Sequence, residues 1–126
     1  WPDCKVISFD PAPFSIKAAQ PIEEKYPNRF TYFSKRPVWH PEKTKIDLMF
    51  IDGGHSYQSV KRDIEYMQTV NPKWGLFDNY ELAGVRQACK DMKFDLESRN
   101  PEYFFYVNTH KGKVNPGIML LLNLDV

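Results

Sequence analysis

Acidic side chains follow three separate short apolar runs of the sequence. They are Asp10, Asp52 and Asp78, and Asn79 comes directly after the last of them. If the three runs are parallel strands of one sheet, their carboxyl ends lie along one edge, and the residues that follow them surround a single crevice. Carboxylate and amide oxygens suit a hard cation such as Mg²⁺, which keeps several waters and takes few protein ligands. The pattern therefore predicts a polar site with the chemistry of a divalent cation site.

His55 lies close behind Asp52, with two glycines between them. An unperturbed imidazole titrates near neutral pH, so His55 is a candidate general base in the same crevice. Two simpler interpretations stand beside this one. Asp52 could cap the helix that follows, with Gly53 and Gly54 forming only a tight turn, and His55 could be an ordinary surface residue at the start of that helix.

The positions of these candidate residues depend on the predicted strands, which alternate with helices along most of the chain. We expect strands over residues 4–9, 30–33, 46–51 and 74–77, and a final antiparallel pair over residues 103–107 and 118–122. The run 46–51 is apolar throughout apart from Asp47, which is typical of a strand buried on both faces. The arrangement predicts an α/β fold with a Rossmann-like, mostly parallel sheet that ends in the antiparallel pair.

The helices between these strands are predicted from apolar spacing. One runs from Tyr57 to a stop at Asn71-Pro72, and another covers residues 82–96. An earlier helix begins near Ser15. Pro21 should start, kink or split it, because proline removes an amide donor and clashes with the preceding turn.

Composition restricts the class of protein. The chain has 126 residues and a net charge of +1 from 17 basic and 16 acidic residues. This length suits one domain, and the charge balance gives no general attraction to nucleic acid or an anionic membrane. The longest apolar run is too short to span a bilayer. Cys4 and Cys89 lack metal-ligand spacing, so we expect a cytoplasmic protein with reduced thiols. Because it begins at Trp1 without a methionine, we expect a single domain over 1–126 that is a fragment or a shortened form.

Two segments resemble a known family. The stretch from Ile46 to Tyr57, continued by Val60, Asp63 and Ile64, is similar to the DLxFIDGxHxYxxVxxDI segment of class I S-adenosylmethionine-dependent methyltransferases. The nearest branch contains the metal-dependent O-methyltransferases of small molecules. Asp78-Asn79-Tyr80, followed by Gly84-Val85, resembles the next strand end and helix of that branch. The likeness is specific from about Lys45 to Ala88.

The resemblance implies a role for each candidate residue. Asp52, Asp78 and Asn79 would hold a divalent metal, with Mg²⁺ expected. His55 falls where catechol-type enzymes place a catalytic lysine and would serve as the base. Asp10 matches the acid that binds the ribose hydroxyls of S-adenosylmethionine, so cofactor contacts would come from Asp10 and Asp52. The implied reaction is methyl transfer to a small hydroxylated substrate.

The chain departs from the family at its first strand. The glycine-rich turn that cradles the cofactor in the family has no counterpart here, because the sequence begins at the second strand. A non-catalytic methyltransferase-like module, acting in assembly or in binding a partner, is therefore the alternative. A glycosyltransferase or hydroxylase with an acid-ended Rossmann-like sheet is a third interpretation. A homodimer is expected if the edge left by the first strand is exposed.

Overall fold

A computed structural model describes residues 3–36, 45–94, 101–108 and 116–124, with the backbone alone for 101–108 and Pro116. The chain divides into two compact units, Trp1–Trp39 and His40–Val126, and each is described by itself. We call them unit 1 and unit 2. Both combine strands with helices, so the predicted α/β class is confirmed.

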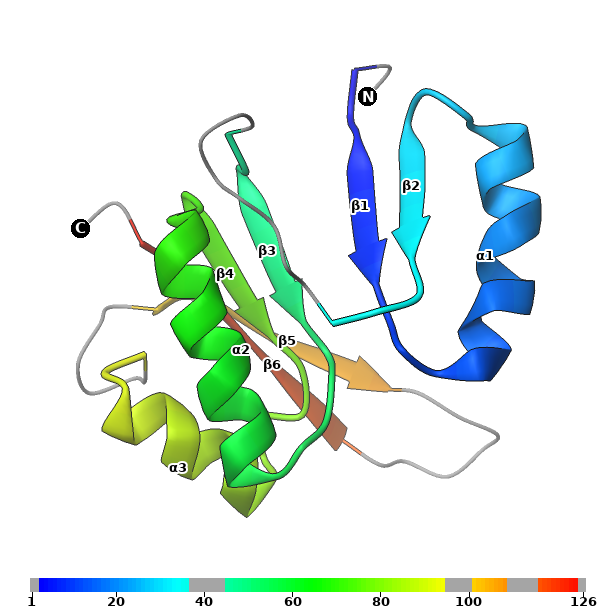
Figure 1. Cartoon of the computed structure of the whole chain (residues 1–126). Coiled ribbons are helices and arrows are strands. Elements are labelled where there is room, and N and C mark those ends of the chain that lie inside the picture. The colour runs from blue at the N-terminus through cyan, green and yellow to red at the C-terminus, as the bar shows by residue number, and fades with distance from the viewer. Residues whose placement is uncertain (1–2, 37–44, 95–100, 109–115, 125–126) are drawn as a thin grey trace. The chain divides into compact units, whose positions relative to one another are not determined.

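Unit 1 is one strand-helix-strand element. Strand β1 (Val6–Phe9) leads through helix α1 (Pro13–Lys25) to strand β2 (Phe30–Phe33), and the two strands pair in parallel (Figure 1). The Phe9 and Phe33 rings stack with their centroids 5.1 Å apart. In the part of unit 1 that the structure describes, Ala19 is the only buried residue.

Helix α1 includes Pro21 in its interior. It begins at Pro13, whose fixed φ and missing amide suit the first turn of a helix, and it continues to Lys25. The helix therefore neither starts nor ends at Pro21. Of the outcomes expected for this proline, a start and a split are both wrong.

Unit 2 contains a four-stranded sheet. Its elements are β3 (Leu48–Ile51), α2 (Tyr57–Val70), β4 (Trp74–Phe77), α3 (Ala83–Asp91), β5 (Pro101–Asn108) and β6 (Pro116–Asn123). The strand order is β3-β4-β6-β5, in which β3 and β4 are parallel and β6 is antiparallel to both its neighbours. The predicted terminal antiparallel pair is thus confirmed. Helix α3 ends at Asp91, earlier than expected, and residues 95 and 96 of the predicted helix lie outside the described residues.

Helix α2 has clear start and stop signals. The Ser56 hydroxyl accepts a hydrogen bond from the Ser59 amide at 3.3 Å, which satisfies one of the free amides of the first turn. At the other end Asn71 adopts a left-handed conformation, with φ 50°, and Pro72 follows. Between these ends Val60, Ile64 and Met67 are buried, so the helix presents one apolar face to the sheet.

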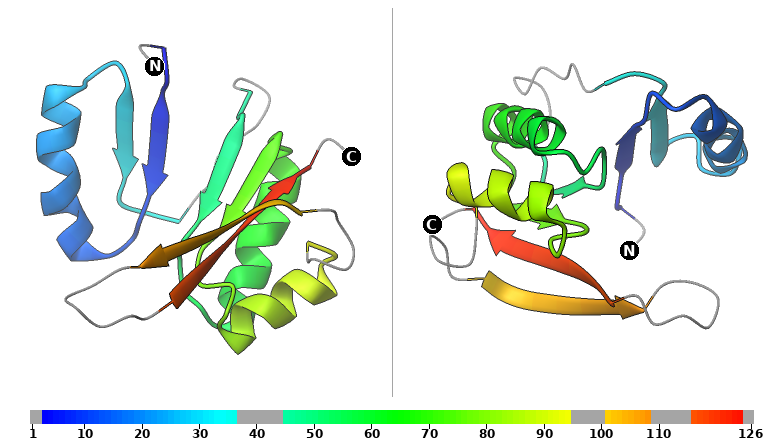
Figure 2. Two further views of the ribbon diagram at one scale, coloured as in Figure 1. Left: turned by 180° about the vertical axis from the view of Figure 1, so that it is seen from behind. Right: turned by 90° about the horizontal axis from the view of Figure 1, so that it is seen from below.

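The core of unit 2 lies between the two helices and one face of the sheet. Helices α2 and α3 cover the same side of β4 and β6 in Figure 2. The buried cluster includes Ile51 and Phe77 from the parallel strands, and Leu120 and Leu122 from β6. The same cluster contains Val60, Ile64, Met67, Val85, Ala88 and Cys89 from the helices.

The opposite face of this sheet is apolar but much less buried. Leu48 is 50% exposed and Phe50 is 48% exposed. Phe50 pairs with Leu76, and Leu76 pairs with Leu121, so the three side chains form one row across the sheet. Leu76 and Leu121 are only partly buried. The expectation that residues 46–51 are buried on both faces is therefore wrong.

Candidate functional site

The ends of β3 and β4 bring two predicted site residues together. Asp52 follows β3 and Asp78 follows β4, and the last paired residues of these parallel strands are Ile51 and Phe77. The Asp78 amide donates to the Ile51 carbonyl at 3.0 Å, which extends the pairing by one residue. The two carboxyl groups lie close enough for their charges to interact. Two carboxyl groups so placed can share a proton or hold a cation.

Burial and the charge of Asp78 raise the pKa of Asp52 above its ordinary value of 3.8, and a hydrogen bond that protonated Asp52 donates to Asp78 acts in the same direction. His55 opposes this shift. Its Nε2 atom lies 3.9 Å from Oδ1 of Asp52, with the two side chains 43% and 49% exposed. At that distance and exposure the ion pair is weak. His55, the predicted base, nevertheless lies beside Asp52.

Gly84 allows the loop that carries His55 to pack closely against helix α3. A Cβ atom on Gly84, in the first turn of α3, would lie 2.5 Å from the His55 carbonyl oxygen and 3.0 Å from the Tyr57 amide nitrogen. Only glycine permits this approach. Since Ser56 is the cap of α2, the alternative interpretation of Asp52 as a helix cap is wrong.

Asn79 turns toward a residue that the sequence analysis missed. Its backbone is left-handed, with φ 54°, and its Nδ2 atom donates to Oε1 of Glu81 at 3.4 Å. Oε2 of Glu81 accepts from the Ile118 amide at 2.8 Å, which ties the loop after β4 to strand β6. The sequence offered one indication of Glu81, because it is a second acidic residue in the loop that contains Asp78.

Hydrogen bonds decide the ionisation of Glu81. Burial acts to raise its pKa, but the bonds from the Ile118 amide, its own amide and Asn79, together with the charge of His55, outweigh burial. The pKa of Glu81 is therefore lowered. Glu81 adds a stable negative charge on the side of the site where Asn79 and His55 lie.

The structure brings the residues predicted to hold a metal together only in part. Within the described ranges, no three His, Cys, Asp or Glu side chains are grouped so that they could hold a metal ion. Asp52 and Asp78 supply two carboxylates, and the Asn79 amide nitrogen is directed to Glu81. Mg²⁺ is commonly held by one or two carboxylates with waters completing its shell. The carboxyl pair fits this smaller requirement.

Asp10 lies in unit 1 and serves the start of helix α1. Its Oδ1 atom accepts from the Ala12 amide at 2.8 Å, and its Oδ2 atom accepts from the Ser15 hydroxyl. The Tyr32 hydroxyl donates to the Asp10 carbonyl at 2.6 Å. Each carboxylate oxygen keeps a second lone pair, so the predicted ribose contact remains chemically feasible.

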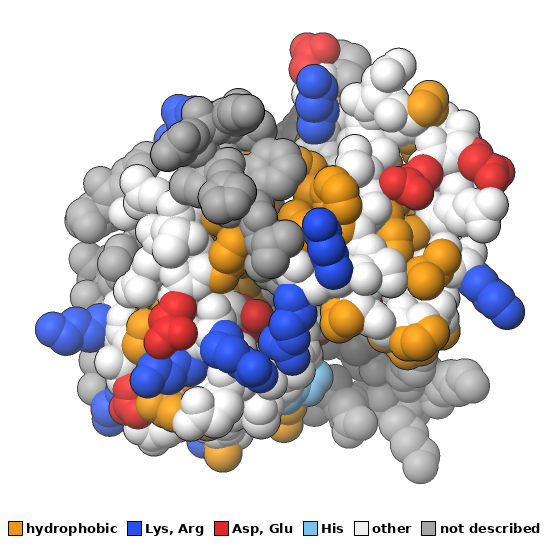
Figure 3. Space-filling view, in the orientation of Figure 1, with side chains coloured by type: hydrophobic (Ala, Val, Ile, Leu, Met, Phe, Trp, Pro, Cys, Tyr) orange, Lys and Arg blue, Asp and Glu red, His pale blue; other side chains and the backbone are white. Residues whose placement is uncertain are grey.

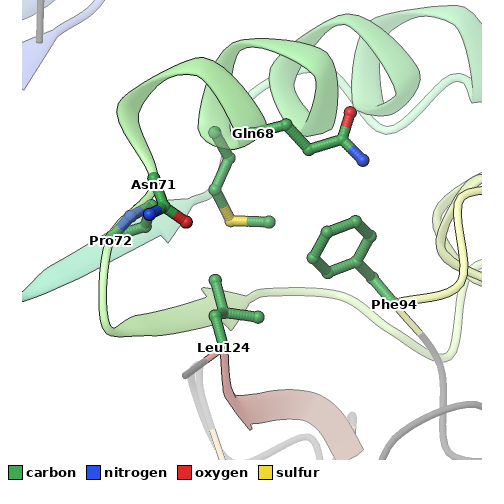
Figure 4. Close-up of a pocket in the computed structure, with 6 residues that line it drawn as sticks. Gln68, Asn71, Pro72, Phe94 and Leu124 are labelled. Atoms are coloured by element: carbon green, nitrogen blue, oxygen red, sulfur yellow. The ribbon is translucent and has the colours of Figure 1, made fainter. Parts of the chain in front are cut away.

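A small cavity lies at the other end of the unit 2 sheet (Figure 4). Its volume is about 160 Å³, and its lining residues are Met67, Gln68, Asn71, Pro72, Phe94 and Leu124. The Leu124 amide donates to the Lys73 carbonyl, immediately before β4 begins, whereas Asp78 follows the end of β4. None of the predicted site residues lines this cavity.

The surface agrees with the balanced composition. Acidic and basic side chains are mixed on the face seen in Figure 3, as a net charge of +1 would lead one to expect. No helix among the described residues combines the length and apolar character needed to cross a bilayer.

Comparisons with protein-family models, with curated proteins and with solved structures give no match.

Proposed function

We propose that the chain takes part in S-adenosylmethionine-dependent methyl transfer to a small hydroxylated substrate, assisted by Mg²⁺. The observation that carries the proposal is the Asp52–Asp78 carboxyl pair at the ends of two adjacent parallel strands, with His55 beside it. Ligands of open α/β sheets bind beyond the carboxyl ends of the strands. Two like charges held together there favour a cation or a shared proton.

The strand pairings also support a Rossmann-like sheet. In a doubly wound sheet of order 3-2-1-4-5, the second strand pairs with the third, and the fourth pairs with the fifth. If β1 counts as the second strand, unit 1 contains the first of these pairs as β1 with β2. Unit 2 contains the other as β3 with β4. Both pairs are parallel, as that fold requires.

Each residue has a defined task in the proposed reaction. Asp52 and Asp78 would hold the cation, which when bound would lower the pKa of the acceptor hydroxyl. Nε2 of His55 takes the proton of that hydroxyl. When bound, S-adenosylmethionine would supply the methyl group to the acceptor oxygen, with S-adenosylhomocysteine as the second product. The resemblance would give Asp10, which lies in unit 1, the role of accepting hydrogen bonds from the ribose hydroxyls.

A non-catalytic methyltransferase-like module is the second candidate. It is favoured by the half-exposed apolar side chains of β3, Leu48 and Phe50, which are suited to a protein partner. This candidate predicts a carboxyl pair without any cofactor affinity.

Calorimetric titration of the whole chain with S-adenosylmethionine, with and without Mg²⁺, distinguishes the methyltransferase from the non-catalytic module. We expect saturable binding that Asp10→Ala weakens, and Mg²⁺ binding that Asp52→Asn and Asp78→Asn reduce at least tenfold. Asp47→Asn is the matched control, because Asp47 is an exposed acid at the opposite end of β3. Binding of neither ligand at millimolar concentration would overturn the enzyme proposal and leave the non-catalytic module.

A further inference from the structure

The hydrogen-bond ladder between β4 and β6 changes its partner where β4 ends. Phe77 is the last paired residue of β4 and lies opposite Leu120 of β6. The amide of the next residue, Asp78, donates to β3, so the backbone groups of its neighbours Phe77 and Asn79 point to β6. In a continued ladder Asn79 would lie opposite Ile118, and the Ile118 amide would donate to the Asn79 carbonyl.

The side chain of Glu81 takes the place of this carbonyl. Its Oε2 atom accepts from the Ile118 amide at 2.8 Å, and the Ile118 carbonyl accepts from the Tyr80 amide at 2.9 Å. Asn79 is left-handed, with φ 54°, and its carbonyl accepts instead from the Leu82 amide at 2.9 Å. Glu81 therefore satisfies an amide of β6 whose backbone acceptor has turned away.

The same arrangement turns the chain from β4 into helix α3. Leu82 is the N-cap residue of α3, so the bond from its amide to the Asn79 carbonyl connects the end of the strand to the start of the helix. A strand that continued through Asn79 would direct this carbonyl to β6. The acceptor that Glu81 provides for Ile118 thus allows the turn without leaving an amide of β6 unpaired.

Asp78 is thereby held from two sides. Its amide donates to the Ile51 carbonyl at 3.0 Å, which fixes the strand end to β3. On the side of β6 the bonds come from Tyr80 and Glu81. The Tyr80 bond uses backbone atoms, whereas the Glu81 bond depends on a side chain. Glu81 is therefore the part of this attachment that a substitution can remove.

We propose that Glu81 is a positioning residue for the carboxyl pair, because its bond to Ile118 fixes the strand end that places Asp78 beside Asp52. The inference rests on the proposed cation site and adds a residue beyond its ligands. Within the described ranges Glu81 is not grouped with the two carboxylates as a third metal ligand, so it acts through the loop. Groups that hold metal ligands in place commonly change metal affinity about 10–100-fold when they are removed.

Two substitutions separate the reach of the Glu81 side chain from its charge. Glu81→Gln keeps the length and an oxygen acceptor for the Ile118 amide, but it loses the charge. Glu81→Asp keeps the charge, but it is one methylene shorter and does not reach Ile118. Calorimetric titration of the whole chain with Mg²⁺, in about 0.15 M salt to screen distant charges, should show about tenfold weaker binding in Glu81→Asp and less than about threefold in Glu81→Gln. The reverse order would show that Glu81 acts by its charge and would overturn the proposal.

Hydrogen exchange of the Ile118 amide gives a measurement that does not depend on the metal. Exchange should be slow in the unchanged chain and in Glu81→Gln, and faster in Glu81→Asp. Faster exchange in Glu81→Asp with unchanged Mg²⁺ affinity would overturn the positioning role and leave the proposed cation site standing. Equal exchange in all three chains would overturn the attachment itself. If the unchanged chain binds no Mg²⁺, the proposed cation site is wrong and the positioning role falls with it.

Discussion

The two units contain the same kinds of element but differ in what they bury. Unit 1 has two parallel strands and a helix, yet Ala19 is the only buried residue in its described part, and Phe14 is 76% exposed. Unit 2 joins three strands and two helices through one buried cluster. A two-stranded sheet has too little apolar area to be stable alone. Sequence patterns that correctly predict strands and helices therefore do not show how many residues of a chain are buried in a core.

A pair of phenylalanine truncations gives the largest contrast between the units. Phe77 has no exposed surface, so Phe77→Ala should lower the free energy of unfolding by about 3–5 kcal/mol, the usual cost of such a cavity. Phe14→Ala should change it by less than about 0.5 kcal/mol. Urea unfolding followed by circular dichroism measures both. Similar losses in the two variants would show that unit 1 buries Phe14 after all.

Gly84→Ala tests how tightly the loop carrying His55 is packed. The added methyl group would meet backbone atoms, which cannot move aside as a side chain can. We expect a loss of about 1–3 kcal/mol, the usual cost of overpacking. The control is Gly53→Ala, whose methyl group would lie 3.0 Å from the carboxylate of Asp63, the end of a flexible side chain. An equal effect of both substitutions would contradict a specific contact between α3 and the loop.

Much of the fold could be predicted from local patterns. The strand over 30–33 was predicted with its observed bounds, and α2 was predicted from the spacing of its buried residues and the Asn71-Pro72 stop. The effect of Pro21 on helix α1 was harder to predict, because the destabilisation by a proline depends on the conformation of the neighbouring helical turns, which the sequence alone does not give. The exposure of Phe50 could not be predicted either, since an interior strand and an unprotected edge strand have the same composition.

The candidate site shows the same limit. Parallel strand ends correctly placed Asp52 beside Asp78, because that follows from topology alone. The sequence did not reveal that the Asn79 amide turns to Glu81, since this depends on a left-handed backbone and on a contact with distant Ile118. Long-range pairing is what local patterns leave out. The metal, cofactor and substrate assignments remain predictions.

The acids of the two units should respond in opposite ways to substitution. Asp10 accepts hydrogen bonds from the start of α1, where a negative charge also suits the helix dipole. Asp10→Ala should therefore destabilise α1 by about 1 kcal/mol. Asp10→Asn retains an acceptor and should cost less. Hydrogen exchange of the α1 amides reports the effect. Unchanged protection in Asp10→Ala would show that these contacts do not stabilise the helix.

Removing the charge of Asp52 should stabilise the chain, in contrast to the removal of Asp10, because the surroundings of Asp52 disfavour its charge. Its pKa in the folded chain is raised above 3.8, so between that value and the raised one the folded state binds more protons than the unfolded state. Stability contributed by this group is present below pH 3.8 and is lost as pH rises through the folded pKa.

Asp52→Asn removes the charge and should slightly stabilise the chain at neutral pH. The gain is small because the side chain is 49% exposed and solvent screens it. Urea midpoints measured across the acidic range should converge for variant and unchanged chain at low pH and separate as pH rises. Asp47→Asn, an exposed acid at the other end of β3, should give no such separation. If Asp52→Asn instead destabilises the chain at neutral pH, the Asp52 charge is stabilised by its surroundings, and the repulsion inferred between Asp52 and Asp78 is wrong.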